Sequence, residues 1–245
     1  MRRVGHKGAD LLAPGNTFAA FQAAIEAGVD MLEFDVLPER RDGTGELYLA
    51  HDYADLGARA DAVTLDEGLE HLAGQAYADV ELDVDMKLPG YELRVLQALR
   101  ERGLLGRSLI SSFERESLRV VRAADPTVRL GLSIPRLRSD PTTRARTKLA
   151  ALALAAVARR ILPTVLARRI RRGEMDAVMV HWRLMSPRLL RAVRAAGGEV
   201  YVWTVDDVAT VRRLEALGVD GVITNDPTLF WGGDGGPAAA AIRRP

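Results

Sequence analysis

The stretch GVDMLEFDV at residues 28–36 contains a predicted strand in which two acids, Glu33 and Asp35, interrupt an apolar run. Side chains two residues apart on a strand point to the same face, so both carboxylates lie on one side. A second predicted strand repeats this geometry with Asp85 and Lys87. We therefore expect three acids and a lysine to converge where these strands end, and the fold must bring those ends together.

Short apolar or β-branched runs recur along the whole chain and are predicted as strands at residues 3–5, 31–36, 80–86, 108–112, 129–133, 177–181, 199–204 and 221–224. Segments with apolar residues at helical spacing lie between them, at residues 17–27, 93–102, 116–124, 187–196 and 208–217. Asn16 or Thr17 is suited to cap the first of these helices. This alternation is typical of parallel strands joined by crossover helices.

Such alternation permits either a closed barrel or an open doubly wound sheet. In most units the polar residues cluster where a predicted strand ends, and a closed barrel brings all those ends to one face. The length of 245 residues is close to the ~250 typical of such a barrel. We therefore predict an α/β fold, a single-domain (β/α)8 TIM barrel over residues 1–231, followed by a flexible Gly/Ala/Pro-rich tail at 232–245.

Composition narrows the functional classes. Hydrophobic residues make up 48% of the chain and charged residues 27%, which suits a globular protein with a large core. Cysteine is absent, so any metal is held by oxygen or imidazole. Aromatic residues are sparse at 5% and no nucleic-acid recognition motif is present, so we expect no nucleic-acid partner. The first residues contain no apolar segment of the signal-peptide kind, and we expect a cytoplasmic location.

The predicted convergence of Glu33, Asp35 and Asp85 indicates a metal site, because carboxylates crowded inside an apolar barrel repel one another unless a cation compensates them. Oxygen ligands select Mg²⁺ or Ca²⁺, and Mg²⁺ commonly keeps positions open for phosphate oxygens. The small-molecule substrate is therefore expected to be a phosphate ester. Taken singly, such residues are usually structural or solvated, and their joint occurrence at strand ends favours a site.

Two histidines are expected beside these acids. His6 ends the first predicted strand, and His51 ends a short extra strand predicted at residues 47–52, after a turn at Asp42-Gly43. Two imidazoles that flank one substrate can serve as an acid and base pair. Their positions do not tell which of them is the acid.

Several motifs occur in a characteristic order: His6-Lys7-Gly8, Asn16-Thr17, GVDMLEFDV, His51-Asp52, Asp85-Met86-Lys87, Ser111-Ser112-Phe113, VWTVDD and GVDGVITNDP. In this order, and over nearly the whole chain, they resemble the glycerophosphodiester phosphodiesterase family. The resemblance implies metal-dependent hydrolysis of glycerophosphodiesters to an alcohol and glycerol 3-phosphate by general acid/base catalysis. It further implies metal ligands and an acid and base pair at the residues named above, Glu33, Asp35, Asp85, His6 and His51.

The resemblance also implies substrate-binding residues. Lys7 replaces the family's phosphate-contacting arginine with a point charge, and Lys87 would neutralise phosphoryl oxygens. Asn16 belongs to the same set. Trp203 is expected either to offer its ring to a choline-like headgroup or to pack inside the barrel.

The chain also departs from the family pattern. It has Gly15 and Asp85 where the family usually has glutamates, and only 32 residues separate Asp52 from Asp85, so the family's inserted subdomain is expected to be reduced or absent. Asp85 followed by Lys87 also resembles the sphingomyelinase D group, whose usual cysteines are missing here. The alternatives are therefore phospholipase D-like cleavage of lysophospholipids or sphingolipids at a membrane surface, and a barrel that binds phosphodiesters without turnover.

A basic segment, Arg136–Arg172, holds ten arginines and one lysine against a single acid, interleaved with Leu, Ala, Ile and Val. This pattern is typical of a helix that lies on an anionic membrane surface. The alternative is an ordinary barrel helix with a solvated arginine face. We take peripheral contact with an anionic membrane as the prediction.

Overall fold

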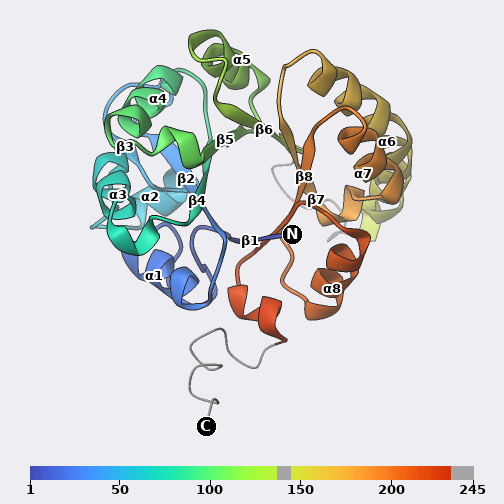
Figure 1. Ribbon diagram of the computed structural model, residues 1–245, viewed down its shortest axis with the longest axis horizontal. Helices are drawn as coiled ribbons and strands as arrows, with labels where there is room; N and C mark the ends of the chain where they lie inside the picture. The colour runs from blue at the N-terminus through green and yellow to red at the C-terminus, as the bar shows by residue number, and fades with distance from the viewer. Residues whose placement is uncertain (137–144, 233–245) are drawn as a thin grey trace.

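The computed structural model describes residues 1–136 and 145–232, with side chains described for 1–136 and 156–232 (Figure 1). The predicted tail therefore lies outside the described residues, apart from Gly232. Residues 137–144 of the predicted basic segment lie outside them as well.

Eight parallel strands close into a barrel, which confirms the predicted fold class (Figure 1). The sheet order is β1-β9-β8-β7-β6-β5-β4-β2, and pairing of β1 with β2 closes the ring. The predicted strands are all present, with ends shifted by one or two residues at most: β1 (Arg2–Gly5), β2 (Met31–Pro38), β4 (Glu81–Met86), β5 (Ser108–Ser112), β6 (Arg129–Ile134), β7 (Ala177–His181), β8 (Glu199–Trp203) and β9 (Gly221–Thr224).

Amphipathic helices surround the barrel and bury their apolar faces against the strands (Figure 1). Their bounds are α1 (Phe18–Glu26), α3 (Leu65–Leu72), α4 (Glu92–Glu101), α5 (Arg115–Ala124), α6 (Ala145–Arg171), α7 (Pro187–Arg194) and α8 (Val208–Leu217). Of the two candidate caps for α1, Thr17 is the N-cap, since its hydroxyl accepts from the backbone N–H of Ala20. The Asn16 side chain instead hydrogen-bonds to Asp35. No helix of the described chain is long and apolar enough to cross a membrane.

The extra strand is shorter than predicted. β3 comprises only Leu47–Tyr48 and pairs antiparallel with the end of β2. The chain then turns, because the N–H of Leu49 bonds to Val63 and Asp52 caps the short helix α2 (Tyr53–Gly57). His51 therefore lies in a loop at the rim instead of on a strand. Only α2, α3 and the 3₁₀ helix η1 (Gln75–Tyr77) fill the chain between β3 and β4.

The barrel interior is layered. Alternate residues of each strand point inward, as the period of two requires. The amino-terminal end holds a group of paired arginines and glutamates, and an apolar layer lies above it, formed by Val4, Met31, Leu109, Ala177, Met179, Tyr201 and Ile223. Gly221 makes room in this layer, since a Cβ there would lie 2.3 Å from the ring of Tyr201. The inward-pointing residues at the carboxyl ends are largely polar, and these form the site.

Candidate active site

A pocket of about 150 Å³ opens at the carboxyl ends of the strands. Six of the nine predicted site residues line it: His6, Glu33, His51, Asp85, Lys87 and Trp203. They lie on or directly after four strands, and in one loop, that are distant in sequence, so barrel closure is what assembles them. The charged residues come from β1, β2, β4 and the loop after β3, whereas Phe113, Met179, Trp203 and Ile223 make the opposite wall more apolar.

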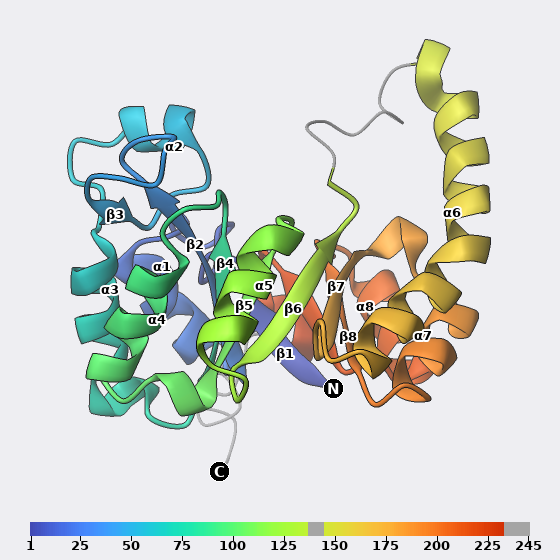
Figure 2. The same cartoon turned by 90° about the horizontal axis from the view of Figure 1, so that it is seen from above.

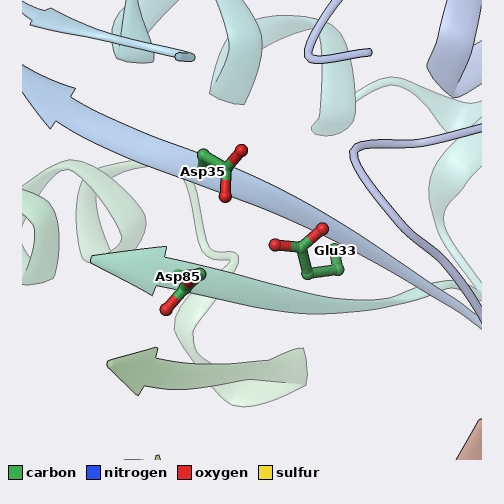
Figure 3. Close-up of side chains that lie close together, drawn as sticks. All are labelled: Glu33, Asp35 and Asp85. Carbon is green, nitrogen blue, oxygen red and sulfur yellow. The ribbon is translucent and has the colours of Figure 1, made fainter. Parts of the chain in front are cut away.

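Three buried carboxylates form the charged centre of the site (Figure 3). Glu33 and Asp35 project from β2, and Asp85 projects from the neighbouring strand β4, where it pairs in register with Asp35. One oxygen of each lies within 4.8 Å of the others, so the three residues could hold a metal ion. Their side chains are at most 9% exposed, and water therefore compensates little of their charge.

Lys87 lies against two of these carboxylates. Its Nζ contacts Asp35 and lies 2.5 Å from Asp85. Burial alone would raise the pKa of Asp35, but Lys87 holds that pKa well below its usual value. Burial, followed by the charge of Asp35, raises the pKa of Glu33 far above normal. One lysine therefore does not balance three acids, and the remaining charge needs a proton or a cation.

The loop after β1 holds the acids in place. The backbone N–H of Lys7 donates to Glu33 at 2.7 Å, and Lys7 adopts a left-handed conformation with φ of 50° to do so. Asn16, also left-handed at φ 58°, makes two hydrogen bonds to Asp35. Its side-chain amide donates to the carboxylate at 2.9 Å, and its carbonyl accepts from the Asp35 N–H at 3.1 Å. Two unusual backbone conformations thus orient two carboxylates.

The two histidines have different environments. The Nδ1 of His6 lies 2.6 Å from the side-chain oxygen of Asn225, and the Asn225 amide donates to Asp206 at 2.7 Å. The Nε2 of His6 points toward Glu33 at 3.9 Å, and burial lowers the His6 pKa. His51 is half exposed at the rim, with its Nδ1 3.3 Å from Asp52. One histidine is therefore fixed and mostly buried, and the other is half exposed.

The model of the glycerophosphoryl diester phosphodiesterase family matches residues 6–44 and 48–229, which is most of the chain and includes every residue of the site. The chain belongs to this family. The predicted recognition is thereby confirmed, as is the predicted class of enzyme, a phosphoric diester hydrolase.

Individual relatives agree with the family match. The chain is 26% identical over 257 residues to the glycerophosphodiester phosphodiesterase of Caldanaerobacter subterraneus subsp. tengcongensis, covering 91% of this chain and 93% of that one. It shares its fold with a phosphodiesterase of Oleispira antarctica, solved in complex with the product sn-glycerol-3-phosphate, at a TM-score of 0.71 and 18% identity, covering 95% of this chain and 96% of that one. A 43-residue stretch, 16% of each chain, is 51% identical to a dermonecrotic toxin of the spider Loxosceles variegata.

Two residues that the family resemblance implied as substrate-binding do not line the pocket. Asn16 is fully buried and engages Asp35. The ammonium group of Lys7 lies 3.2 Å from Asp10, which also accepts from the Gly15 N–H at 2.9 Å. A Cβ on Gly15 would lie 2.4 Å from Asp10, so this family member has no room there for the usual glutamate. Contact of Lys7 and Asn16 with substrate stays a prediction.

Asp83 is a member of the site that the sequence argument missed. It lies two residues before Asp85 on β4, is 1% exposed and lines the pocket floor. Burial raises the pKa of its carboxyl to about 7, and its Oδ1 has no hydrogen-bond partner in the described chain. The alternation that revealed Asp85 also places Asp83 on the inner face. The motif comparison directed attention to Asp85 and Lys87 only.

Trp203 forms part of the apolar wall of this phosphodiesterase pocket. Its indole N–H donates to the carbonyl oxygen of Met179 at 2.8 Å. The rings of Phe113 and His181 lie edge-on to it, with centroids 5.7 Å and 5.1 Å away. These contacts fix the ring at the pocket wall. Contact with a choline-like headgroup stays a prediction.

Proposed function

We propose that this chain hydrolyses glycerophosphodiesters to an alcohol and glycerol 3-phosphate, with a divalent cation, Mg²⁺ or Ca²⁺, held by Glu33, Asp35 and Asp85. The observation that carries the proposal is the group of three buried carboxylates within 4.8 Å, beside a lysine and two histidines in one pocket. The product found in the Oleispira antarctica relative supports the substrate class.

The residues fit a hard divalent ion. The donor set is entirely carboxylate oxygen, which suits Mg²⁺ and Ca²⁺. Oδ1 of Asp35 is buried and its contact is the ammonium group of Lys87, which leaves one lysine against three buried carboxylates. A divalent ion there would stabilise the negative charge that develops on the phosphoryl oxygens. Lys87, held between Asp35 and Asp85, lines the pocket and adds a second positive charge.

We assign His6 as the general base and His51 as the general acid. The side-chain NH2 group of Asn225 donates to Asp206, so its side-chain oxygen faces His6 and accepts a hydrogen bond from the Nδ1–H of that ring. That tautomer leaves Nε2 as an acceptor, and the lowered pKa keeps the ring neutral, as a base requires. His51 is half exposed at the rim, where a departing alcohol leaves, and its Nδ1 lies 3.3 Å from Asp52.

We also propose the bounds of the functional domain and the cellular location of the enzyme. One barrel over residues 1–231 forms the functional unit, and the enzyme is cytoplasmic with peripheral contact to an anionic membrane through Arg136–Arg172. Support for the membrane contact comes from α6, which contains no acidic residue in its whole length.

The first test is an assay of glycerol 3-phosphate release from glycerophosphocholine and glycerophosphoethanolamine with Mg²⁺, Ca²⁺ or EDTA. We expect metal-dependent release by the parent protein and none by His6→Ala. His71→Ala is the matched control. His71 lies on α3, away from the pocket, and its Nε2 hydrogen-bonds to Tyr77 of η1. No release from folded parent protein under any condition would favour a barrel that binds phosphodiesters without turnover.

A second test separates the acid from the base. A nitrophenolate leaving group departs without a proton, so it removes the need for an acid. We expect His51→Ala to lose roughly 10²–10⁴-fold activity on glycerophosphocholine and much less on a nitrophenyl phosphodiester. His6→Ala should be equally impaired on both substrates. The reverse pattern would exchange the two roles.

Phospholipase D-like cleavage of lysophospholipids or sphingolipids is the second candidate. It is favoured by the Asp85-Met86-Lys87 sequence and by the short match to the Loxosceles variegata toxin. Parallel assays with lysophosphatidylcholine and sphingomyelin decide between the two. A higher kcat/KM on either lipid than on glycerophosphocholine would replace the first proposal.

A further inference from the structure

The outer face of α6 carries an exposed apolar ridge. Val157, Ile161 and Val165 follow one another at four-residue spacing, which places them on one side of the helix. They are 52%, 55% and 38% exposed, whereas Leu166 on the inward side is 2% exposed. Single exposed apolar residues are common on protein surfaces, but a ridge of three on one helix face is a contact surface.

Arginines accompany this ridge. Arg160 and Arg168 lie on the same exposed side of α6, and neither forms an ion pair with any residue of the described chain. No acidic residue occurs from Ala145 through Gly173. An ordinary solvated helix face would mix both signs of charge and lack the apolar ridge.

A groove of about 390 Å³ between α5 and α6 extends the arginine surface. Glu174 is its single acidic lining residue among those described, and that carboxylate is already shared by Arg169 at 2.9 Å and Arg115 at 3.8 Å. The lining residues are Arg115, Arg119, Thr164, Val165, Arg168, Arg169, Arg172 and Glu174. The groove is therefore strongly positive and continuous with the apolar ridge through Val165.

We propose that this surface, formed by the ridge Val157, Ile161 and Val165 and the arginines of the α5–α6 groove, binds an anionic phospholipid membrane. Arginines match the phosphate oxygens of lipid headgroups, and the three aliphatic side chains are suited to insert between them. Figure 2 shows that α6 runs along the flank of the barrel and that its amino-terminal part extends beyond the barrel at the end where α2 lies. The proposed surface follows the flank from the middle of α6 to its carboxyl end. Docking there holds the enzyme beside the membrane that supplies lipid-derived phosphodiesters, so this inference rests on the proposed function.

The test is flotation of the full-length protein with vesicles of phosphatidylglycerol and phosphatidylcholine, compared with pure phosphatidylcholine. We expect binding to the anionic vesicles only, weakening as salt rises. Arg168→Gln with Arg172→Gln should lower the vesicle affinity roughly thirtyfold, because each arginine near such a surface contributes about 1 kcal/mol, or about fivefold. Val157→Ser with Ile161→Ser should lower it by a similar factor while keeping the preference for anionic lipid.

Matched controls come from other faces of the barrel. Leu93→Ser removes an apolar side chain on α4 that is 56% exposed, and Arg213→Gln removes an exposed arginine on α8. Neither should change vesicle binding. All these variants should hydrolyse glycerophosphocholine at the parent rate, since none of them lines the pocket, so failure of docking and failure of the proposed function give different results.

Three outcomes would overturn the inference. The first is absence of flotation with anionic vesicles, or equal flotation of parent and ridge variants. The second is self-association in sedimentation that Ile161→Ser abolishes, which would assign the ridge to a second copy of this chain. The third is retention of a DNA duplex that vesicles do not displace, which would assign the groove to nucleic acid.

Discussion

The two ends of the barrel interior both hold groups of charged side chains, and they differ in charge balance. At the amino-terminal end Arg2 and Arg129 each contact both Glu81 and Glu199, with N–O distances of 2.7 to 3.2 Å. Two positive and two negative charges close a ring across β1, β4, β6 and β8. The hydroxyl of Tyr201 joins it, accepting from Arg129 at 3.2 Å.

At the carboxyl end the balance is lost. Among the described residues, Glu33, Asp35 and Asp85 face one lysine, Lys87, and one histidine, His6, whose pKa burial lowers. The loop after β1 uses backbone and amide groups to keep two of these acids in place. Charge in excess is costly inside a protein and persists only where other interactions hold it. Balanced charges therefore fill the amino-terminal end of the barrel, whereas the unbalanced end is suited to receive a ligand.

The largest expected effect, on kcat/KM, comes from removing one of the excess negative charges at the carboxyl end. Glu33→Gln should lower kcat/KM by roughly 10³-fold or more, because a metal ligand that contributes several kcal/mol is lost. The same change should raise the melting temperature of the metal-free protein, since it removes a carboxylate that is costly beside Asp35. Activity assays and thermal melts in EDTA measure both. A variant that melts lower than the parent would contradict the view of an unbalanced end.

Metal should stabilise only a protein with an intact carboxyl end. At 100 times its dissociation constant, Mg²⁺ or Ca²⁺ should stabilise the folded parent by about 2.7 kcal/mol. Glu33→Gln should show little of this gain, and Arg129→Met should retain it. Thermal melts across a metal titration give the result, and an equal shift in all three proteins would place the ion elsewhere.

Breaking the balanced end should cost stability and leave activity unchanged. Arg129→Met deprives Glu81 and Glu199 of a shared partner, and we expect a loss of about 1–3 kcal/mol in the free energy of unfolding. Arg100→Met is the control, because its pair with Asp125 is exposed and should contribute less than about 0.5 kcal/mol. Urea denaturation measures both, and kcat/KM should stay at the parent value.

The smallest effect, within about 1 kcal/mol at the partly exposed Glu81, is a contrast in the pH dependence of stability between the two ends. Glu33 has a raised pKa, so the metal-free protein loses stability as pH rises above the usual glutamate value. Although burial opposes it, bonds to Arg129 and Arg2 lower the pKa of Glu81, so the stability it contributes is lost as pH falls through that lowered pKa.

Urea denaturation in EDTA from about pH 3 to about pH 8 tests this contrast. The gap between parent and Glu33→Gln should widen toward neutral pH, and the gap between parent and Glu81→Gln should close at the acidic end. Parallel curves for the two variants would show that both ends respond alike to pH.

The clustering of polar residues at the predicted strand ends selected the barrel. Periodicity in the sequence was sufficient for the strands and for the shared face of Glu33 and Asp35. These depend on local alternation, which each segment carries by itself. It was less successful at the rim, where β3 stops at Tyr48 and His51 enters a loop. A tertiary hydrogen bond from Leu49 to Val63 decides that turn, and short-range patterns do not contain it.

By itself the sequence determined the alternation of strands and helices, the residue types at the strand ends and the family. Only the tertiary structure decided which acids are balanced. Asn16 became a partner of Asp35, Asp83 joined the pocket floor, and the arginines of α5 met those of α6 across a groove. The physical reason is that burial and charge compensation depend on neighbours distant in sequence, which meet only when the barrel closes.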